Sequence, residues 1–152
     1  MTIGFVGARF VATALAASAG AVAVAGCSSS GPPPQPGSMA ANTARVIING
    51  KDVAGLQAVT CSQLQWSSTI ETFDKQPGFT VLVTNAGDKV IPQAVEIRDL
   101  GGFTGSYWQG LIGQAQATSN GGTYTIIGTA QGSYAEAPNK QSTGAFKIET
   151  AC

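Results

Sequence analysis

The chain has 152 residues, with eight basic and eight acidic side chains and a formal net charge of zero at pH 7. Its lysines and arginines are scattered along the sequence, so the clustered basic surface that binds nucleic acid phosphates is not expected. The sequence contains no histidine, which excludes Ser-His-Asp and Cys-His nucleophile systems and histidine-ligated metal sites. Glycine is frequent and aromatic residues are few, a composition typical of short strands joined by turns.

Residues 1–26 predict a secretory signal peptide. A single charged residue, Arg9, precedes an apolar run of small and medium-sized residues over 10–26, which is the layout of an export signal. A retained membrane helix is the alternative, but such a helix needs about 20 mainly apolar residues. The run is shorter than this and is rich in alanine and glycine, so we expect the leader to be removed.

The leader ends in Val24-Ala25-Gly26-Cys27, which resembles the lipobox of bacterial lipoproteins, an aliphatic residue and two small residues before a cysteine. The resemblance implies a diacylglycerol thioether on the Cys27 thiol, cleavage before Cys27 and a further acyl chain on the new amine. One acyl chain binds a membrane only marginally, whereas two or more attach a protein stably at about 0.8 kcal/mol per buried CH₂. The alternative is a stray cysteine in a leader. No cofactor is expected beyond this covalent lipid.

Residues 27–43 predict a lipidated cysteine followed by a flexible tether rich in Ser, Gly and Pro. The prolines at 32–34 and 36 favour an extended polyproline II conformation, and the flanking Ser and Gly residues favour mobile ends. At about 3.1 Å per extended residue, the segment can hold a domain up to about 50 Å from a bilayer.

Residues 44–152 predict one mainly β domain. Segments with strand character are separated by turn sequences such as Asn49-Gly50, and they cover 45–50, 56–61, 79–85, 93–100, 107–117, 123–132 and 144–152. Residues 64–73 fit either a strand or a short helix, and residues 133–143 are expected to form a long loop. The pattern favours a small antiparallel β-sandwich or a sandwich-like domain.

The last segment has the clearest period of two, with Phe146, Ile148 and Cys152 on one face, which predicts that Cys152 points inward. Cys61 ends another predicted strand. If Cys27 carries lipid, Cys61 and Cys152 are the two remaining thiols of an exported chain, which predicts a structural disulfide between them. A redox pair and a metal site are the alternatives, although two thiolates without histidine make a poor metal site.

The residues bear on three classes of function: an enzyme, a carrier with an apolar pocket, and a protein that acts by interaction. An enzyme without histidine would rely on carboxylates or lysines with shifted pKa values, but no two acidic residues pair on one strand face, and Glu96 and Arg98 predict a solvated ion pair. The glycine-rich segment 101–105 lacks the GxGxxG spacing and predicts a turn.

A carrier would need an apolar pocket, whereas most aromatic residues are expected to build the core. Tyr107 and Trp108 are adjacent and point to opposite faces of a strand, so we expect one of them to contact a sugar or a partner.

Four segments carry a family resemblance: 45–52 (RVIINGKD), 59–61 (VTC), 113–132 (GQAQATSNGGTYTIIGTAQG) and 146–152 (FKIETAC). Through them the chain resembles the mycobacterial LpqH lipoprotein family, typified by the nineteen-kilodalton lipoprotein antigen. The resemblance is looser over 62–112, where 62–73 (SQLQWSSTIETF) and 105–110 (GSYWQG) depart from the Gly/Ala-rich pattern of that family, so any functional surface shared by the family is in doubt there.

The resemblance implies a triacylated lipoprotein on the extracytoplasmic face of the cell membrane and envelope, with an acyl end sensed by Toll-like receptor 2. It implies no enzymatic activity. It also implies O-linked mannose on hydroxyl residues of the tether, for which the candidates are Ser28, Ser29, Ser30, Ser38 and Thr43. We therefore expect an antigen or adhesin-like protein that acts by interaction, with a carrier of a lipid or glycolipid as the alternative. The oligomeric state is left open.

Overall fold

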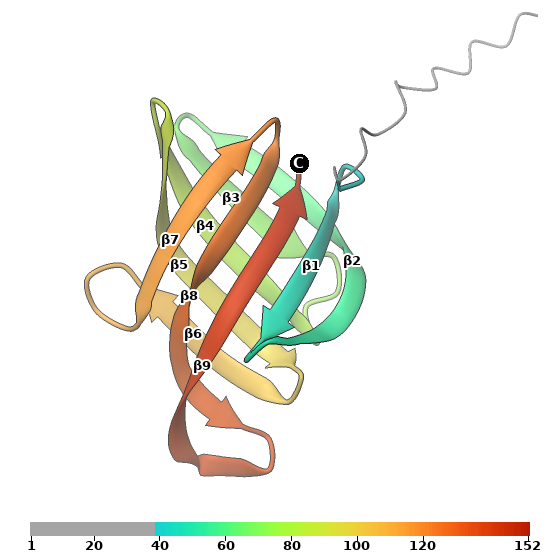
Figure 1. Ribbon diagram of the computed structural model, residues 1–152, viewed down its shortest axis with the longest axis vertical. Coiled ribbons are helices and arrows are strands. Elements are labelled where there is room, and N and C mark those ends of the chain that lie inside the picture. Colours follow the sequence, from blue (N-terminus) through green and yellow to red (C-terminus); the bar gives the residue numbers. More distant parts are fainter. Residues whose placement is uncertain (1–38) are drawn as a thin grey trace, which may run out of the picture. The chain divides into compact units, whose positions relative to one another are not determined.

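The computed structural model describes residues 39–152 of the chain. The predicted leader, Cys27 and the tether up to Ser38 lie outside the described residues. Residues 39–152 are built of strands and turns only, and they include no helix (Figure 1). A membrane-crossing helix is therefore absent from this part of the chain.

Nine strands follow one another, and every pairing between them is antiparallel. In chain order they are β1 (Thr43–Ile48), β2 (Lys51–Leu64), β3 (Ser67–Thr72), β4 (Gly78–Ala86), β5 (Lys89–Leu100), β6 (Phe103–Trp108), β7 (Gln114–Asn120), β8 (Thr123–Tyr134) and β9 (Ala137–Ala151).

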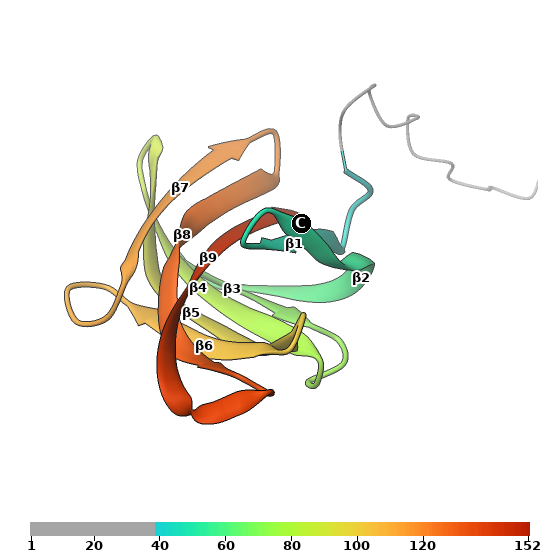
Figure 2. The ribbon, with the colours of Figure 1, turned by 60° about the horizontal axis from the view of Figure 1, so that its bottom comes forward.

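The strands belong to one sheet that closes on itself. Its order is β4-β3-β2-β1-β9-β8-β6-β5-β7, and β4 also pairs with β5. Both β6 and β7 lie between β5 and β8, each covering a different part of these two long strands (Figures 1 and 2). The predicted mainly β, antiparallel, sandwich-like domain is confirmed. A single curved sheet supplies both of the layers that enclose the core.

Alternation along the strands places one set of side chains inside this sheet. Phe146 and Ile148 of β9, which the period of two predicted to share a face, are 2% and 0% exposed. Phe79 of β4 and Phe103 of β6 are fully buried. The Phe103 ring lies where glycine leaves room, since a Cβ added to Gly144 would lie 2.8 Å from its Cζ atom. The inward positions are therefore filled by closely packed side chains.

Two of the predicted boundaries are wrong. The predicted strand 107–117 is divided, because β6 ends at Trp108 and the chain turns at Gly110 and Gly113, whose φ angles are +72° and +69°. The predicted loop 133–143 is instead a hairpin formed by the ends of β8 and β9. This hairpin was missed because its residues are mostly solvent-accessible and show no apolar alternation. The ambiguous segment 64–73 is a turn followed by β3.

The predicted disulfide between Cys61 and Cys152 is confirmed, with 5.9 Å between the two Cα atoms. Cys61 lies on β2 and packs against the core, whereas Cys152 follows β9 and is exposed. The prediction that Cys152 points into the core is therefore wrong, because the strand ends at Ala151. The bridge ties β2 to β9 just beyond the start of β1, which lies between them in the sheet.

We expect reduction of this disulfide to lower the free energy of unfolding by about 4–5 kcal/mol, because the bond closes a loop with a sequence separation of 91 residues. Urea unfolding of the native chain with and without a phosphine reductant measures the difference. A chain with Cys61 and Cys152 both changed to Ala should match the reduced protein. Unchanged stability in both comparisons would contradict the prediction.

Candidate functional site

A row of outward-facing side chains crosses four strands of the sheet. Thr69 of β3 pairs with Leu82 of β4, Leu82 pairs with Ala94 of β5, and Ala94 pairs with Trp108 of β6. Most of the flanking strand residues, such as Ile70, Val81 and Val95, are buried inside the sheet, so alternation directs this row outward. Four residues far apart in sequence thus form a continuous strip on the outer face.

An open groove of about 230 Å³ lies along this strip. Its floor and walls combine apolar groups with hydroxyl and carboxylate groups, and the lining residues are Thr69, Thr80, Leu82, Ala94, Val95, Glu96 and Trp108. Most of the lining is apolar, and the polar groups of Thr80 and Glu96 lie together, since these two residues are cross-strand partners. The groove therefore has an apolar floor and a polar rim.

Trp108 is the exposed member of the predicted Tyr107–Trp108 pair. Its side chain is 51% exposed, whereas Tyr107 is 4% exposed and belongs to the core. The Tyr107 hydroxyl donates a hydrogen bond to the Pro92 carbonyl oxygen at 3.2 Å, and burial raises the pKa of this phenol above its usual value. Of the two residues singled out from the sequence, only Trp108 is available to a ligand.

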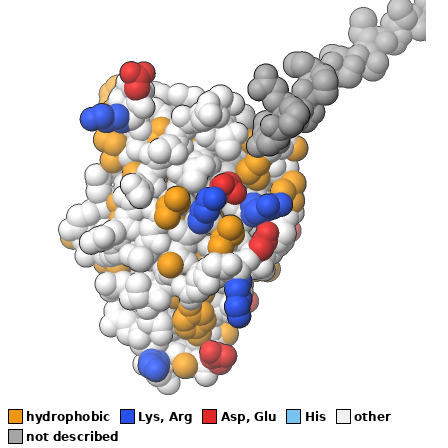
Figure 3. Space-filling view, viewed as in Figure 1, with side chains coloured by type: hydrophobic (Ala, Val, Ile, Leu, Met, Phe, Trp, Pro, Cys, Tyr) orange, Lys and Arg blue, Asp and Glu red, His pale blue; other side chains and the backbone are white. Residues whose placement is uncertain are grey.

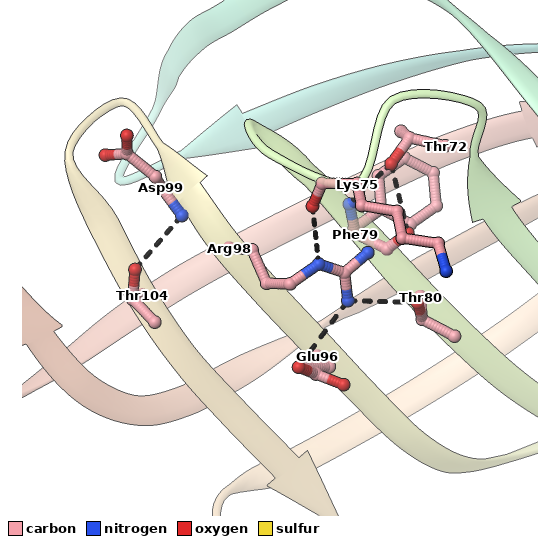
Figure 4. A network of polar contacts seen from close by, with 8 residues as sticks. All are labelled: Thr72, Lys75, Phe79, Thr80, Glu96, Arg98, Asp99 and Thr104. Carbon is pink, nitrogen blue, oxygen red and sulfur yellow. Dashed lines mark hydrogen bonds and ion pairs between the residues drawn. The ribbon is translucent and has the colours of Figure 1, made fainter.

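The polar rim is held in place by Arg98 (Figure 4). Its Nε donates to the Lys75 carbonyl oxygen at 2.7 Å, and its Nη1 donates to Thr80 Oγ1 at 3.0 Å. The same Nη1 lies 3.5 Å from Glu96 Oε1, which confirms the predicted ion pair. The Arg98 side chain is only 17% exposed, so it connects the β3–β4 loop, β4 and β5 from a partly buried position. Thr80 and Glu96 are thereby fixed before any ligand arrives.

The loop after Trp108 extends the apolar surface. Leu111 and Ile112 are 83% and 37% exposed, and the backbone N–H of each donates to the Trp108 carbonyl oxygen at 3.0 Å. Large apolar side chains are also exposed at the β2–β3 turn, where Leu64 and Trp66 are 79% and 62% exposed. The chain thus exposes apolar surface beside the groove and at one hairpin tip.

The face formed by β1, β8 and β9, with the start of β2, carries charged side chains of both signs. Positive and negative side chains lie side by side on it (Figure 3), including the pairs Arg45–Asp52 at 3.4 Å and Lys147–Glu149 at 2.7 Å. No group of three potential metal ligands occurs within residues 39–152. Ion pairs, and not a patch of one sign, characterise this face.

The remaining predicted site residues lie mainly outside the described part of the chain. The lipidation candidate Cys27 and the glycosylation candidates Ser28, Ser29, Ser30 and Ser38 are among them. Thr43 is described, and it is the first residue of β1. Its hydroxyl donates a hydrogen bond to the Ala40 carbonyl oxygen, so it is engaged at the start of the domain.

These observations define a small, disulfide-tied, antiparallel β domain with an open groove on its outer face. Comparison with known proteins then identifies its relatives: the chain belongs to the Mycobacterium 19 kDa lipoprotein antigen family, whose model matches residues 37–152. The family resemblance found in the sequence is thereby confirmed. The chain is accordingly a surface lipoprotein associated with the membrane or envelope.

Three relatives illustrate the range of similarity. A putative lipoprotein of Mycobacterium avium subsp. hominissuis is 36% identical over 115 residues, which cover 76% of this chain and 79% of that protein. The probable lipoprotein LppE of Mycobacterium tuberculosis is 38% identical over 109 residues, 72% of this chain and 77% of that protein. Lipoprotein LpqH of Mycobacterium tuberculosis is 29% identical over 114 residues, 74% of this chain and 71% of that protein.

We expect Arg98→Ala to destabilise the folded chain by about 1–2 kcal/mol, because it removes two hydrogen bonds made from a partly buried position. Arg45→Ala is the matched control, since the Arg45 side chain is 51% exposed and its ion pair is expected to contribute less than about 1 kcal/mol. Chemical denaturation measures both. Equal losses for the two variants would contradict a special role for Arg98.

Proposed function

We propose that this lipoprotein is anchored to the extracytoplasmic face of the cell membrane by acyl chains on Cys27 and acts by interaction, not by catalysis. The lipobox-like sequence before Cys27 and the family membership support the anchor. The observation that carries the mode of action is the filled interior, where residues such as Phe79, Ile97 and Ile126 are 0% exposed. Partners therefore have to bind on the outer surface.

The position of the first described residues supports this arrangement. The backbone N–H of Asn42 donates to the Ala151 carbonyl oxygen, and the Asn42 carbonyl accepts from Val59, so the chain enters the sheet between β2 and β9. Figure 1 shows this entry beside the C-terminus. An anchor on the N-terminal side would thus be connected to the end of the domain where Cys61 and Cys152 lie.

The carrier alternative receives less support. A lipid carrier needs an apolar pocket that encloses most of its ligand, and the inward positions of the sheet are occupied by packed side chains. The groove beside Trp108 is open to solvent and includes a carboxylate in its lining. Its size and polarity fit recognition of part of a molecule at the surface better than the enclosure of an acyl chain.

Glycosylation of the tether is proposed for Ser28, Ser29, Ser30 and Ser38. Thr43 is a poorer acceptor, because its hydroxyl is hydrogen-bonded and its backbone is the first residue of β1. We propose that any attached glycans are on residues that precede β1 in the sequence.

We expect the membrane-extracted protein to have the mass of a chain that begins at Cys27 and carries two or three acyl chains, with hexose increments on the tether. The full-length Cys27→Ala variant should lose both the acyl mass and partition into the detergent phase, because no other acyl acceptor is supplied by the lipobox. Cys61→Ala is the control for loss of a cysteine elsewhere. Wild-type partition by the Cys27→Ala variant would contradict the anchor.

We further propose that the acylated end is sensed by Toll-like receptor 2, as the family resemblance implies. Buried acyl methylenes contribute large, non-directional binding energy, whereas the chain as a whole has no net charge. The full-length Cys27→Ala variant should need roughly a hundredfold or higher concentration than the acylated chain to activate reporter cells. An acylated Trp108→Ala variant should remain active. Equal activity of the acylated and Cys27→Ala chains would contradict this assignment.

A further inference from the structure

The groove beside Trp108 brings an aromatic ring, aliphatic side chains and polar groups together on a solvent-facing sheet. A half-exposed indole stands next to the apolar groups of Leu82 and Ala94, and hydroxyl and carboxylate groups line the same groove. We propose that this groove binds a hexopyranose ring of a saccharide. The inference deepens the proposed function, on which it rests for its setting, by naming the class of partner that the outer surface recognises.

The apolar part of the groove fits one side of a sugar ring. A pyranose presents C–H groups on its faces, and an exposed aromatic ring offers a flat surface for such a face to cover, with the removal of apolar area from water as the driving force. Trp108 lies at one end of the cross-strand row, with Ala94 and Leu82 next in line. The volume of about 230 Å³ is sufficient for one ring.

The polar part of the groove fits the hydroxyl groups at the edge of the same ring. Glu96 Oε atoms accept hydrogen bonds, and Thr80 Oγ1 both donates and accepts. A charge-assisted bond to a carboxylate is stronger than a bond between neutral groups. Arg98 holds both side chains, at 3.5 Å from Glu96 and 3.0 Å from Thr80, which lowers the entropy lost when a ligand binds. Figure 4 shows this arrangement on β4 and β5.

Other ligand classes fit the groove less well. An acyl chain would cover Glu96 and Thr80 without satisfying their hydrogen bonds, which is costly. A phosphate group would face the Glu96 carboxylate, and the Arg98 guanidinium is already paired with that carboxylate. A peptide cannot extend the sheet here, because β4 and β5 are paired on both sides.

A single ring in an open groove should bind weakly, with a dissociation constant of about 1 mM or higher. Suitable probes are the methyl glycosides of mannose, glucose and galactose, and a linear trisaccharide of whichever binds. The test uses the ¹⁵N-labelled full chain in a detergent without a sugar headgroup. The chain has two tryptophans, so the two indole N–H signals report separately on the groove and on the β2–β3 turn.

We expect a saturable shift of the Trp108 indole signal with at least one of these sugars and an unchanged Trp66 signal. Trp108→Ala, followed through the backbone amide signals of β4 and β5, should abolish binding, and Glu96→Gln should weaken it about five- to tenfold. Two matched controls should bind as wild type. Trp66→Phe changes the other exposed tryptophan, and Glu149→Gln removes the carboxylate of the Lys147–Glu149 pair on the opposite face. Dispersed amide signals confirm that each variant is folded.

The proposal is overturned if none of the probes shifts the Trp108 signal, if both indole signals shift together, or if folded Glu149→Gln loses as much affinity as Glu96→Gln. These results are independent of the anchor. An acyl mass on Cys27 without sugar binding would reject the saccharide site alone, whereas sugar binding by a chain without acyl mass would reject the anchor alone.

Discussion

Pairing of β4 with β5 closes the sheet, and the two sides of the sheet become chemically different as a result. Every second residue of a strand then faces an interior that water does not enter, and the alternate residues face solvent. Val81 of β4 and Val95 of β5 are cross-strand partners and both fully buried, while the next residues, Leu82 and Ala94, pair on the outside. The core and the groove are thus the two faces of the same set of strand pairs.

The closed sheet also determines which strands lie beside the start of β1. β1 lies between β2 and β9, and the disulfide spans these two strands just beyond the point where β1 begins. Asn42 makes the last backbone contacts with both neighbours and has a φ of +58°, a left-handed conformation that asparagine tolerates better than most residues. The bridge therefore lies beside the residues with which the described chain enters the sheet. The described part of the chain therefore begins at the same end of the domain as the disulfide.

Local pattern was sufficient to predict the fold class and the disulfide. The alternation of Phe146 and Ile148 is visible in the sequence, and Cys61 and Cys152 were paired because two thiols remained in an exported chain. The groove was not predicted, because Thr69, Leu82, Ala94 and Trp108 become neighbours only through the register of four strands. The aromatic side chain of Trp108 made it a candidate contact residue, but nothing in the sequence around Thr80 or Leu82 indicates a site. Glu96 was recognised as half of an ion pair, and its place on the groove rim required the structure.

The cost in stability of a substitution differs between the inner and outer faces of the sheet, and this difference determines where a binding site can arise in the domain. Opening the interior for a lipid would mean removing large buried side chains such as Phe79 or Phe103, at about 3–5 kcal/mol each. Typical domains have only about 5–15 kcal/mol of net stability, so one such cavity would cancel the whole contribution of about 4–5 kcal/mol expected from the disulfide. Outward positions away from the Arg98 hydrogen bonds carry no such cost, since substitutions there usually change stability by about 0.5 kcal/mol or less. A groove around Trp108 can therefore gain or lose affinity for a ligand while the folded state persists, whereas a new internal pocket would remove a large share of the net stability.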